Sequence, residues 1–374
     1  MEYRDLERLG ISVSLLGYGC MRFPTKDDGK IDRMEAEKLI DTAYENGINY
    51  FDTAYFYHEG ESEPFVGSAL SKYKRSTYYV ATKLPPWQVN SLEDASRIFN
   101  KQLERLDMDY IDFYLLHSLN KKMWDKMVRL KVPEFYDELK KQGKIKYFGF
   151  SFHDDYEVFE EILNHRQWDF CQIQLNYMDT MEQAGIKGYH LAQRLGIPVV
   201  VMEPVKGGLL ASLPDDISHK LKENKPDASV ASWALRWVAN LPNVKVVLSG
   251  MSSREQLEDN LKTFNVFKPL DLHEQNIIED ISKTLKSRVN NGCTGCNYCM
   301  PCPKGVDIPY NFRIWNNYGI YQNRNSALQQ WKNEIPDNQK AANCVSCGLC
   351  EKVCPQKIEI RNDLKRLQKE FERL

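Results

Sequence analysis

Eight cysteines gathered in one short segment constrain this chain more than any other sequence feature. Of the ten cysteines among 374 residues, eight lie between positions 293 and 354, while Cys20 and Cys171 stand alone. In a small secreted protein such a cluster would form disulfides, but the N-terminal MEYRDLERLG lacks the apolar core of a secretory signal. We therefore expect a cytoplasmic chain whose clustered cysteines bind metal. The expected division falls near residue 286, between a domain of 1–285 and one of 286–374.

The clustered cysteines form two runs with iron–sulfur spacing. The first run is Cys293, Cys296, Cys299 and Cys302, and the second is Cys344, Cys347, Cys350 and Cys354. The second has the C-x2-C-x2-C-x3-C-P spacing of bacterial ferredoxins, in which three cysteines wrap one cubane and the fourth ligates the neighbouring cluster. This rule predicts two [4Fe-4S] clusters, one of them on the first three cysteines of the first run plus Cys354. The other would take Cys302, whose run is one residue short, with Cys344, Cys347 and Cys350. Zinc on two CxxC pairs, and disulfides, are the alternatives.

The chain around these runs supports a small protein module of its own. The 41 residues between the runs look helical and resemble the helical ferredoxin modules of multi-domain redox enzymes. Residues 286–374 hold 14 Lys or Arg against 8 Asp or Glu, an excess of six positive charges. This excess can serve as counter-charge for anionic clusters, or as a docking face for an acidic electron partner. We expect a mainly helical, ferredoxin-like iron–sulfur domain.

The first 285 residues alternate strand-like apolar runs with amphipathic helical stretches. The expected strands are 14–17, 48–52, 78–82, 111–116, 146–150, 170–175, 198–202 and 244–248. The clearest helices are 33–46, 92–106, 133–142, 156–163, 183–195 and 228–240, several of them stopped by Gly47, Gly143 or Gly196. Eight such units are typical of a (β/α)8 TIM barrel. The alternative, an open doubly wound sheet, lacks its dinucleotide fingerprint, because Arg22 stands where a third glycine belongs after Gly17 and Gly19.

Reactive side chains stand at the C-terminal ends of successive expected strands, where chemistry gathers in such barrels. Asp52 ends the second strand, Tyr57 follows in the next loop, Lys83 ends the third strand and His117 ends the fourth. An ammonium beside a phenol weakens the hold on the phenolic proton, and a carboxylate fixes the ammonium in place. Each residue alone would be an ordinary structural group. Together they predict an acid that protonates an oxyanion.

The segments that carry these residues resemble the aldo/keto reductase family. They are NYFDTAYFY at 49–57, ATK at 81–83 and DFYLLH at 112–117, within a resemblance that covers roughly residues 1–280. The resemblance implies a nicotinamide-dependent oxidoreductase in which Tyr57 donates the proton. It also implies that Lys83 and Asp52 tune this proton donor, and that His117 orients the substrate carbonyl.

The same resemblance implies contacts with the nicotinamide. Ser151 and Gln172 fall on family positions that hold the carboxamide. Met202 stands where the family commonly stacks an aromatic ring, and Phe152 replaces a usual asparagine, so we expect a looser hold on the cofactor or another ring in that place. Further cofactor contacts are expected at Gly19, Met21 and Pro204, and at Gly208 in the loop after the seventh strand.

Phosphate groups are expected at the loops after the seventh and eighth strands, where Lys206 and Gly250 stand, since backbone donors and a helix start suit an anion. Residues 248–260 resemble the family's adenosine segment, which implies Asp259 and Asn260 near the adenine. Gln256 stands where an arginine commonly meets the 2′-phosphate, which leaves Arg254 for that role. This favours NADP(H), with NAD(H) as the alternative; the other interpretation of Arg254 is a solvated side chain in the first turn of a helix.

Composition excludes other classes of protein. With 42% hydrophobic and 27% charged residues and a net charge of −2, the chain belongs to globular proteins rather than disordered ones. Its most continuous apolar stretch, 197–202, is far below the ~20 residues that span a bilayer. No blocks of like charge point to nucleic acid. The expected partners are a small carbonyl or quinone-like substrate and a ferredoxin or flavoprotein, with neither nucleic acid nor membrane.

The sequence therefore predicts a nicotinamide-dependent oxidoreductase whose barrel is followed by two [4Fe-4S] clusters. The rival hypothesis is a sensor or scaffold subunit that binds nicotinamide while its ferredoxin module passes electrons in a larger complex. Turnover of NADPH by the isolated protein separates the two hypotheses, because a sensor would bind the nucleotide without consuming it.

Overall fold

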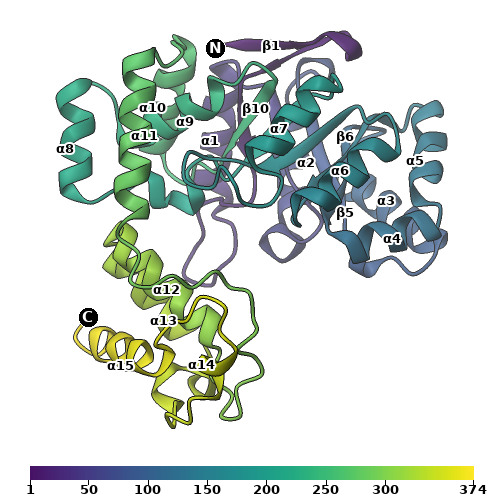
Figure 1. The fold of residues 1–374 in the computed structure, drawn as a ribbon. Coiled ribbons are helices and arrows are strands. Elements are labelled where there is room, and N and C mark those ends of the chain that lie inside the picture. Colours follow the sequence, from purple (N-terminus) through teal and green to yellow (C-terminus); the bar gives the residue numbers. More distant parts are fainter. The chain divides into compact units, whose positions relative to one another are not determined.

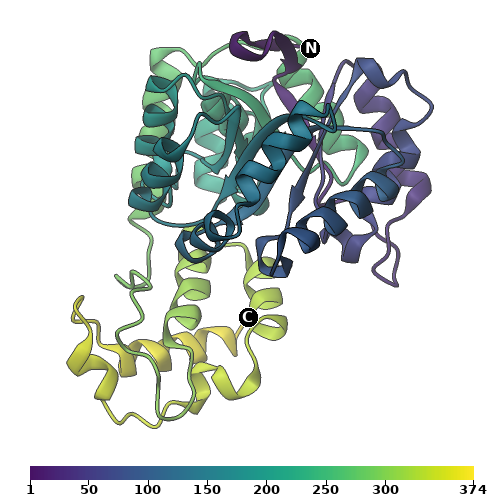
Figure 2. The ribbon, with the colours of Figure 1, turned by 90° about the vertical axis from the view of Figure 1, so that its right-hand side faces the viewer.

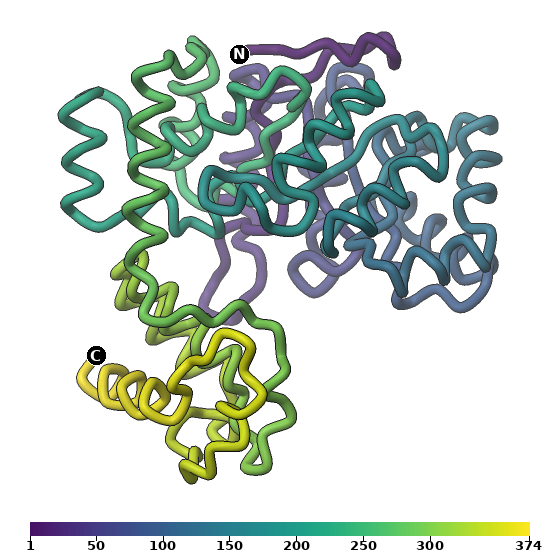
Figure 3. The backbone as a smooth tube through the Cα atoms, viewed as in Figure 1, coloured from purple at the N-terminus to yellow at the C-terminus, as the bar shows by residue number.

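The computed structural model describes residues 1–374, which divide into two compact units. One unit comprises Met1–Gly207 and Ala231–Leu272, and the other comprises Gly208–Val230 and His273–Leu374. Figures 1 and 3 follow the chain through these units from its purple N-terminus to its yellow C-terminus. The predicted domain boundary at residue 286 lies at the end of α11 (Leu272–Lys286) and stays a prediction.

Eight parallel strands close into a barrel, which confirms the predicted fold class. Around the barrel the strands follow the order β10, β3, β4, β5, β6, β7, β8, β9. They are β3 (Leu16–Gly19), β4 (Tyr50–Asp52), β5 (Tyr79–Leu84), β6 (Ile111–Leu119), β7 (Ile145–Phe152), β8 (Phe170–Gln174), β9 (Val199–Met202) and β10 (Val244–Ser249). Parallel neighbours place all the C-terminal strand ends at one face of the barrel, where the predicted site residues stand.

Helices surround the strands, as Figure 2 shows. They are α1 (Arg33–Glu45), α2 (Ser62–Leu70), α3 (Leu92–Leu106), α4 (Lys121–Arg129), α5 (Val132–Lys141), α6 (Tyr156–His165), α7 (Gly185–Arg194), α9 (Val230–Ala239) and α10 (Arg254–Asn265). Gly47, Gly143 and Gly196 follow α1, α5 and α7 with φ of 91°, 74° and 64°, so the predicted glycine stops adopt the left-handed conformation that ends a helix.

The first barrel strand lies two residues further along than predicted. Residues Ile11–Ser14 form β2, which pairs antiparallel with β1 (Tyr3–Leu6) in an N-terminal hairpin outside the barrel, and β3 begins at Leu16. Arg4 in this hairpin donates hydrogen bonds to the carbonyl oxygens of Leu241 and Val244, at 2.8 and 2.6 Å. The hairpin is therefore tied to the start of β10, at the end of the barrel opposite the C-terminal strand ends.

The barrel interior is filled by large apolar side chains, and glycines make room for them. Tyr50, Phe113, Phe170 and Val246 belong to this interior cluster. A methyl group at Gly17 would lie 2.5 Å from the Cγ1 atom of Val246. The barrel is thus a packed core, and its chemistry is confined to the rim.

The second unit is helical, as predicted for the cysteine-rich region. It contains α8 (Asp215–Asn224), α11, α12 (Ile308–Tyr321), α13 (Arg324–Asn333), α14 (Leu349–Val353) and α15 (Ile360–Phe371). Its core packs Phe312, Trp315, Trp331, Leu367 and Phe371 together. None of the helices in the chain has the length and apolar character needed to cross a membrane.

Candidate active site and cysteine cavities

Four predicted residues meet at the C-terminal rim of the barrel. Lys83, fully buried in β5, donates from Nζ to Asp52 Oδ1 at 2.6 Å and to the Thr53 carbonyl at 2.7 Å. The same ammonium lies 3.4 Å from the Tyr57 hydroxyl and 4.9 Å from the centre of its ring. The His117 ring stands edge to face with the Tyr57 ring, 6.1 Å between centroids. These contacts bring the predicted phenol, cation, carboxylate and imidazole into one cluster.

Local backbone geometry holds these side chains in place. Asp52 is the last residue of β4 and pairs with Ala81, two residues before Lys83, on β5. Tyr57 is followed by His58 and Glu59, which have φ of 50° and 56°, and His117 is followed by Ser118 with φ of 53°. Left-handed conformations are costly for residues other than glycine and gather at functional sites. The turn that begins at Tyr57 and the irregular end of β6 at His117 therefore store strain that the surrounding packing must hold.

Burial changes the protonation of the phenol more than its neighbours do. Desolvation raises the pKa of Tyr57 above its ordinary value, and the Lys83 ammonium offsets only part of that rise. Burial also opposes the charge on Lys83, but Asp52 and Tyr57 outweigh it and keep the pKa of Lys83 above its usual value. The sequence-based expectation of a loosely held phenolic proton thus included the effect of the Lys83 ammonium but not the larger, opposite effect of burial. The phenol keeps its proton at neutral pH and has it available to donate.

The imidazole of His117 is neutral. Burial, with Lys83 and His153 adding to it, lowers the pKa of His117 to about 3. Its Nδ1 atom is buried without a hydrogen-bond partner. A neutral ring with an unpartnered nitrogen can bind the oxygen of a substrate without adding a charge to the site.

A cavity of about 390 Å³ opens beside this cluster. Six of the predicted cofactor contacts line it: Gly19, Met21, Ser151, Gln172, Met202 and Gly250. His153 also lines it, together with Asp52, Tyr57 and His117. Sequence reasoning missed Arg22, Glu203 and Leu248, which line the same cavity. Arg22 could have been predicted as a cavity residue from its place in the loop after the first barrel strand, next to Met21.

Two neighbouring polar side chains on β7 and β8 fit a carboxamide. Ser151 and Gln172 are paired in the register of the two strands and are both buried. Gln172 donates from Nε2 to the Met202 sulfur at 3.6 Å, while its Oε1 atom is buried without a partner. A buried acceptor of this kind is costly unless a ligand donates to it. The nicotinamide carboxamide, with its NH2 group, is the ligand expected here.

The predicted phosphate and adenosine residues are engaged in other interactions. Lys206 donates to both carboxylate oxygens of Asp179, at 2.7 and 2.6 Å. Arg254 is exposed and pairs with Glu258 at 2.6 Å, one turn along α10. None of Lys206, Arg254, Pro204, Gly208, Gln256, Asp259 and Asn260 lines the cavity.

Two of the predicted adenosine residues support the loop between β10 and α10. Asn260 is buried and donates to the Ser249 hydroxyl at 2.9 Å, at the end of β10. The Gln256 side chain accepts a hydrogen bond from the Ser252 backbone at 2.8 Å. Both side chains thus hold the loop that contains Gly250. The contacts of Asn260 with adenine and of Gln256 with the cofactor stay predictions.

Arg22 lies between the loops that follow β9 and β10. Its stem packs against Gly250, where an added methyl group would lie 3.2 Å from the arginine Cβ atom. Its Nη2 atom lies 3.8 Å from the place of a methyl group on Gly207. Arg22 therefore presents an unpaired guanidinium to the region where phosphate groups were expected.

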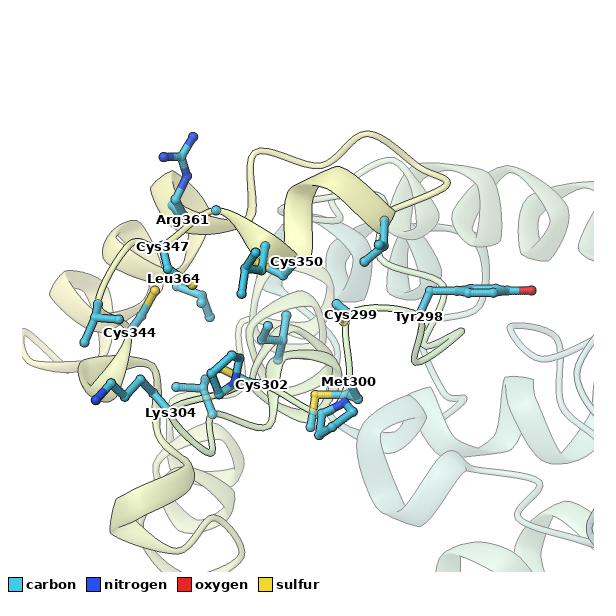
Figure 4. Close-up of a pocket in the computed structure, with 18 residues that line it drawn as sticks. Tyr298, Cys299, Met300, Cys302, Lys304, Cys344, Cys347, Cys350, Arg361 and Leu364 are labelled. Carbon is cyan, nitrogen blue, oxygen red and sulfur yellow. The ribbon is translucent and has the colours of Figure 1, made fainter.

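The eight clustered cysteines divide between two cavities in the crossed pattern predicted from their spacing. Cys302, Cys344, Cys347 and Cys350 line a cavity of about 200 Å³, and Figure 4 shows them around it, drawn from two separate segments. Cys293, Cys296, Cys299 and Cys354 line a narrower cavity of about 20 Å³. Cys299 and Ile308 line both, so the two cavities share a wall. Cys302, whose spacing in the first run departs from the ferredoxin pattern, lines the same cavity as the first three cysteines of the second run.

These thiols suit clusters better than single metal ions. Nowhere in the chain do three or more His, Cys, Asp or Glu side chains converge on a point that one metal ion would occupy. A cubane presents four irons at separate corners, so its cysteines stand around a volume instead of meeting at a point. The donor set and its crossing fit two [4Fe-4S] clusters, although the narrower cavity must widen to take one.

Comparison with known families matches both parts of the chain. The model of the aldo/keto reductase family matches residues 15–283. The model of the 4Fe-4S dicluster domain matches residues 292–359.

Individual relatives agree with the first match. The uncharacterized oxidoreductase YqkF of Bacillus subtilis is 29% identical over 71% of this chain and 92% of its own length. L-galactose dehydrogenase of Arabidopsis thaliana is 25% identical over 75% of this chain and 93% of its own length. Among solved structures, the holo form of aldo-keto reductase AKR11C1 from Bacillus halodurans is 30% identical, with a TM-score of 0.64 over 75% of this chain and 96% of that one. An aldo-keto reductase from Klebsiella pneumoniae in complex with NADPH, 21% identical with a TM-score of 0.59 over 73% of this chain and 92% of that one, shares the fold.

Proposed function

Since this chain belongs to the aldo/keto reductase family and carries a 4Fe-4S dicluster domain, we propose that it reduces a small carbonyl or quinone-like substrate with Tyr57 as the general acid. The chain is an NAD(P)H-dependent oxidoreductase. The observation that carries the proposal is the buried contact of Tyr57 with Lys83 and Asp52, beside neutral His117 and at the wall of the 390 Å³ cavity.

Each side chain of the cluster has a defined task in this proposal. His117 binds the carbonyl oxygen of the substrate and directs it toward the Tyr57 hydroxyl. The nicotinamide, when bound, supplies the hydride that reduces the carbonyl carbon. Tyr57 gives its proton to the oxygen as negative charge develops there, so that the product is an alcohol. Lys83, held by Asp52, then stabilises the phenolate left on Tyr57.

The cofactor would lie along the cavity wall. Ser151 and Gln172 would hold the carboxamide, Met202 would pack near the nicotinamide, and Gly19 and Met21 would contact its ribose side. Toward the phosphates we add Arg22 to the predicted Lys206, Gly208 and Gly250, because it carries the unpaired charge in that region. Arg254 remains the proposed partner of a 2′-phosphate, which favours NADP(H) over NAD(H).

The second unit would supply one-electron chemistry. The proposed ligands of one [4Fe-4S] cluster are Cys293, Cys296, Cys299 and Cys354. Those of the other are Cys302, Cys344, Cys347 and Cys350. The shared wall at Cys299 and Ile308 supports electron exchange between neighbouring clusters. A ferredoxin or flavoprotein is the proposed electron partner, and 286 is the proposed boundary of this domain.

The test is turnover by the intact protein. Protein purified without oxygen is mixed with NADPH and a panel of carbonyls, quinones, flavins and ferredoxins, and NADPH oxidation is followed by absorbance. Oxidation that depends on a carbonyl or quinone supports the proposal. Tight NADPH binding without turnover on any member of the panel would instead support the sensor or scaffold hypothesis.

A further inference from the structure

The wider cysteine cavity lies under an exposed apolar surface. Five large apolar side chains of residues 286–374 are exposed, and four of them line this cavity. They are Tyr298, Val345, Leu349 and Val353, each at least half exposed, and together we call them the apolar patch. Exposed apolar groups gathered at one place mark a surface that a partner covers.

The narrower cavity has no such surface, so the linings of the two cysteine cavities can be compared within the same module. Its lining contains no charged side chain and none of the exposed large apolar residues. Because the two cavities share Cys299 and Ile308, an electron that enters at one can pass to the other. The two cavities therefore differ in the side chains around them: only the wider one is lined by exposed large apolar residues and by charged residues.

Charge at the wider cavity is positive. Its only charged lining residues are Lys304 and Arg361, whose side chains project away from the cavity in Figure 4. Arg361 is neutralised by Glu351 at 2.7 Å, whereas exposed Lys304 has no carboxylate partner. Lys352, beside Val353, is likewise exposed and unpaired. These two unpaired lysines favour a partner with an acidic face.

We propose that the apolar patch docks a small acidic one-electron carrier protein, and that the cluster on Cys302, Cys344, Cys347 and Cys350 exchanges electrons with it. This rests on the proposed function, since it needs that cluster to be present. Each encounter moves one electron: the cluster gains it, the carrier loses it, and no bond is made or broken. Redox encounters of this kind use small interfaces and depend on charge for their rate.

An acidic flavodoxin is the probe for this docking. Its hydroquinone is mixed without oxygen with the oxidised, cluster-loaded protein, and the flavin semiquinone that forms is followed by stopped-flow absorbance. We expect a second-order rate that falls severalfold as salt rises from about 20 to about 200 mM, because screening weakens attraction between unlike charges. A rate that rises with salt would overturn the proposal.

Charge variants test where the flavodoxin docks. Lys304→Glu should slow the reaction about tenfold at low salt. Lys352→Glu should also slow it, and this variant provides the test if Lys304→Glu fails to load its cluster. Lys357→Glu changes the net charge equally but lies in the segment that borders the narrower cavity, and it should change the rate less than about twofold. Leu349→Gln should slow the reaction and leave its salt dependence unchanged.

Two results would contradict the docking proposal. Equal slowing by Lys304→Glu and Lys357→Glu would mean that only overall charge matters. No slowing by Lys304→Glu or by Lys352→Glu would mean that the carrier docks elsewhere. Iron content is measured first on every variant. Wild-type protein without clusters would refute the iron–sulfur part of the proposed function, whereas loaded protein with unchanged rates refutes the docking alone.

Discussion

Lys83 determines the geometry of the candidate active site. It is fully buried and donates to a carboxylate and a backbone carbonyl, with the Tyr57 hydroxyl as the third neighbour of its ammonium. A buried ammonium with three oxygen partners cannot turn away from any of them without losing hydrogen bonds. The phenol is thereby held beside a fixed positive charge, which is the arrangement that a proton donor needs.

The first prediction concerns the proton donor. Tyr57→Phe removes the hydroxyl and leaves the ring and its packing, so kcat for carbonyl reduction should fall by about 10²- to 10⁴-fold. The dissociation constant for NADPH, measured by fluorescence titration, should stay within about twofold of wild type because Tyr57 is not assigned to hold the nucleotide. A variant that keeps a third of the wild-type kcat would refute the assignment.

Residue types predicted the reacting cluster better than they predicted the cofactor contacts. Asp52, Lys83 and His117 stand at or near the C-terminal ends of their strands, with Tyr57 in the loop after Asp52, and closure of the barrel alone brings strand ends together. Lys206 looked free in the sequence, but Asp179 from a different loop takes its charge. Such a partner cannot be read from sequence, because it depends on how two distant loops pack.

The second prediction separates the two arginines near the expected phosphates. Arg22→Met should weaken binding of both NADPH and NADH about tenfold or more, since a charged hydrogen bond contributes about 1.5–3 kcal/mol. Arg254→Ala should weaken NADPH alone, because only NADPH has a 2′-phosphate. Titration of each variant with both nucleotides measures this. Unchanged affinities in Arg22→Met would show that Arg22 does not contact the nucleotide. If wild type and Arg254→Ala both bind NADPH and NADH with equal affinity, the proposed preference for NADP(H) is wrong.

At the scale of elements, a buried polar network links α2 and α3 to the strands behind the site. Glu63 on α2, fully buried, accepts hydrogen bonds from Thr82 at 2.6 Å and from Gln102 at 2.7 Å. It also pairs with Arg105 at 3.1 Å, and Arg105 donates to the Tyr55 carbonyl at 3.1 Å. The network therefore connects the residue before Lys83 with the loop that carries Tyr57.

The third prediction tests this network as a positioning device. Glu63→Gln should lower kcat several-fold while the NADPH dissociation constant stays unchanged, because the loop with Tyr57 loses its anchor and the nucleotide wall does not. The unpaired Arg105 should also cost about 1–3 kcal/mol of unfolding free energy. Glu104→Gln, which changes an exposed carboxylate on α3 next to Arg105, is the matched control and should change neither quantity. Lower stability with an unchanged kcat would reduce Glu63 to a purely structural role.

The bounds of α3, Leu92–Leu106, match those predicted from its amphipathic pattern, although Asp107 and not a glycine follows this helix. The first barrel strand was predicted two residues too early, at 14–17, for a physical reason. Residues Ile11–Ser14 and Leu16–Gly19 are both strands, and nothing local distinguishes the one that pairs in the hairpin from the one that joins the barrel. Only closure of the sheet against β10 decides between them.

At the scale of the whole molecule, the fourth prediction is the metal content. Protein made without oxygen should be brown and contain about eight irons per chain, four for each cluster. The narrower cavity, about 20 Å³, has the less room for a cluster. About four irons per chain would therefore mean that only the wider site is filled. Elemental analysis that finds zinc and no iron would contradict the iron–sulfur assignment for both cavities.

The two parts of the chain are expected to move electrons in two different ways. The barrel passes a pair of electrons as a hydride, whereas each cluster accepts one electron, so nicotinamide should not reduce the clusters directly. A flavin or a substrate that tolerates a radical, such as a quinone, would be needed to split the pair.

Anaerobic stopped-flow spectroscopy tests this separation most directly. Oxidised, cluster-loaded protein is mixed with NADPH alone, and the charge-transfer absorption of the clusters is followed over a single turnover; the same trace is recorded after a quinone is added. We predict that the absorption persists with NADPH alone. Bleaching within one turnover, in protein from which no flavin can be extracted, would contradict the account.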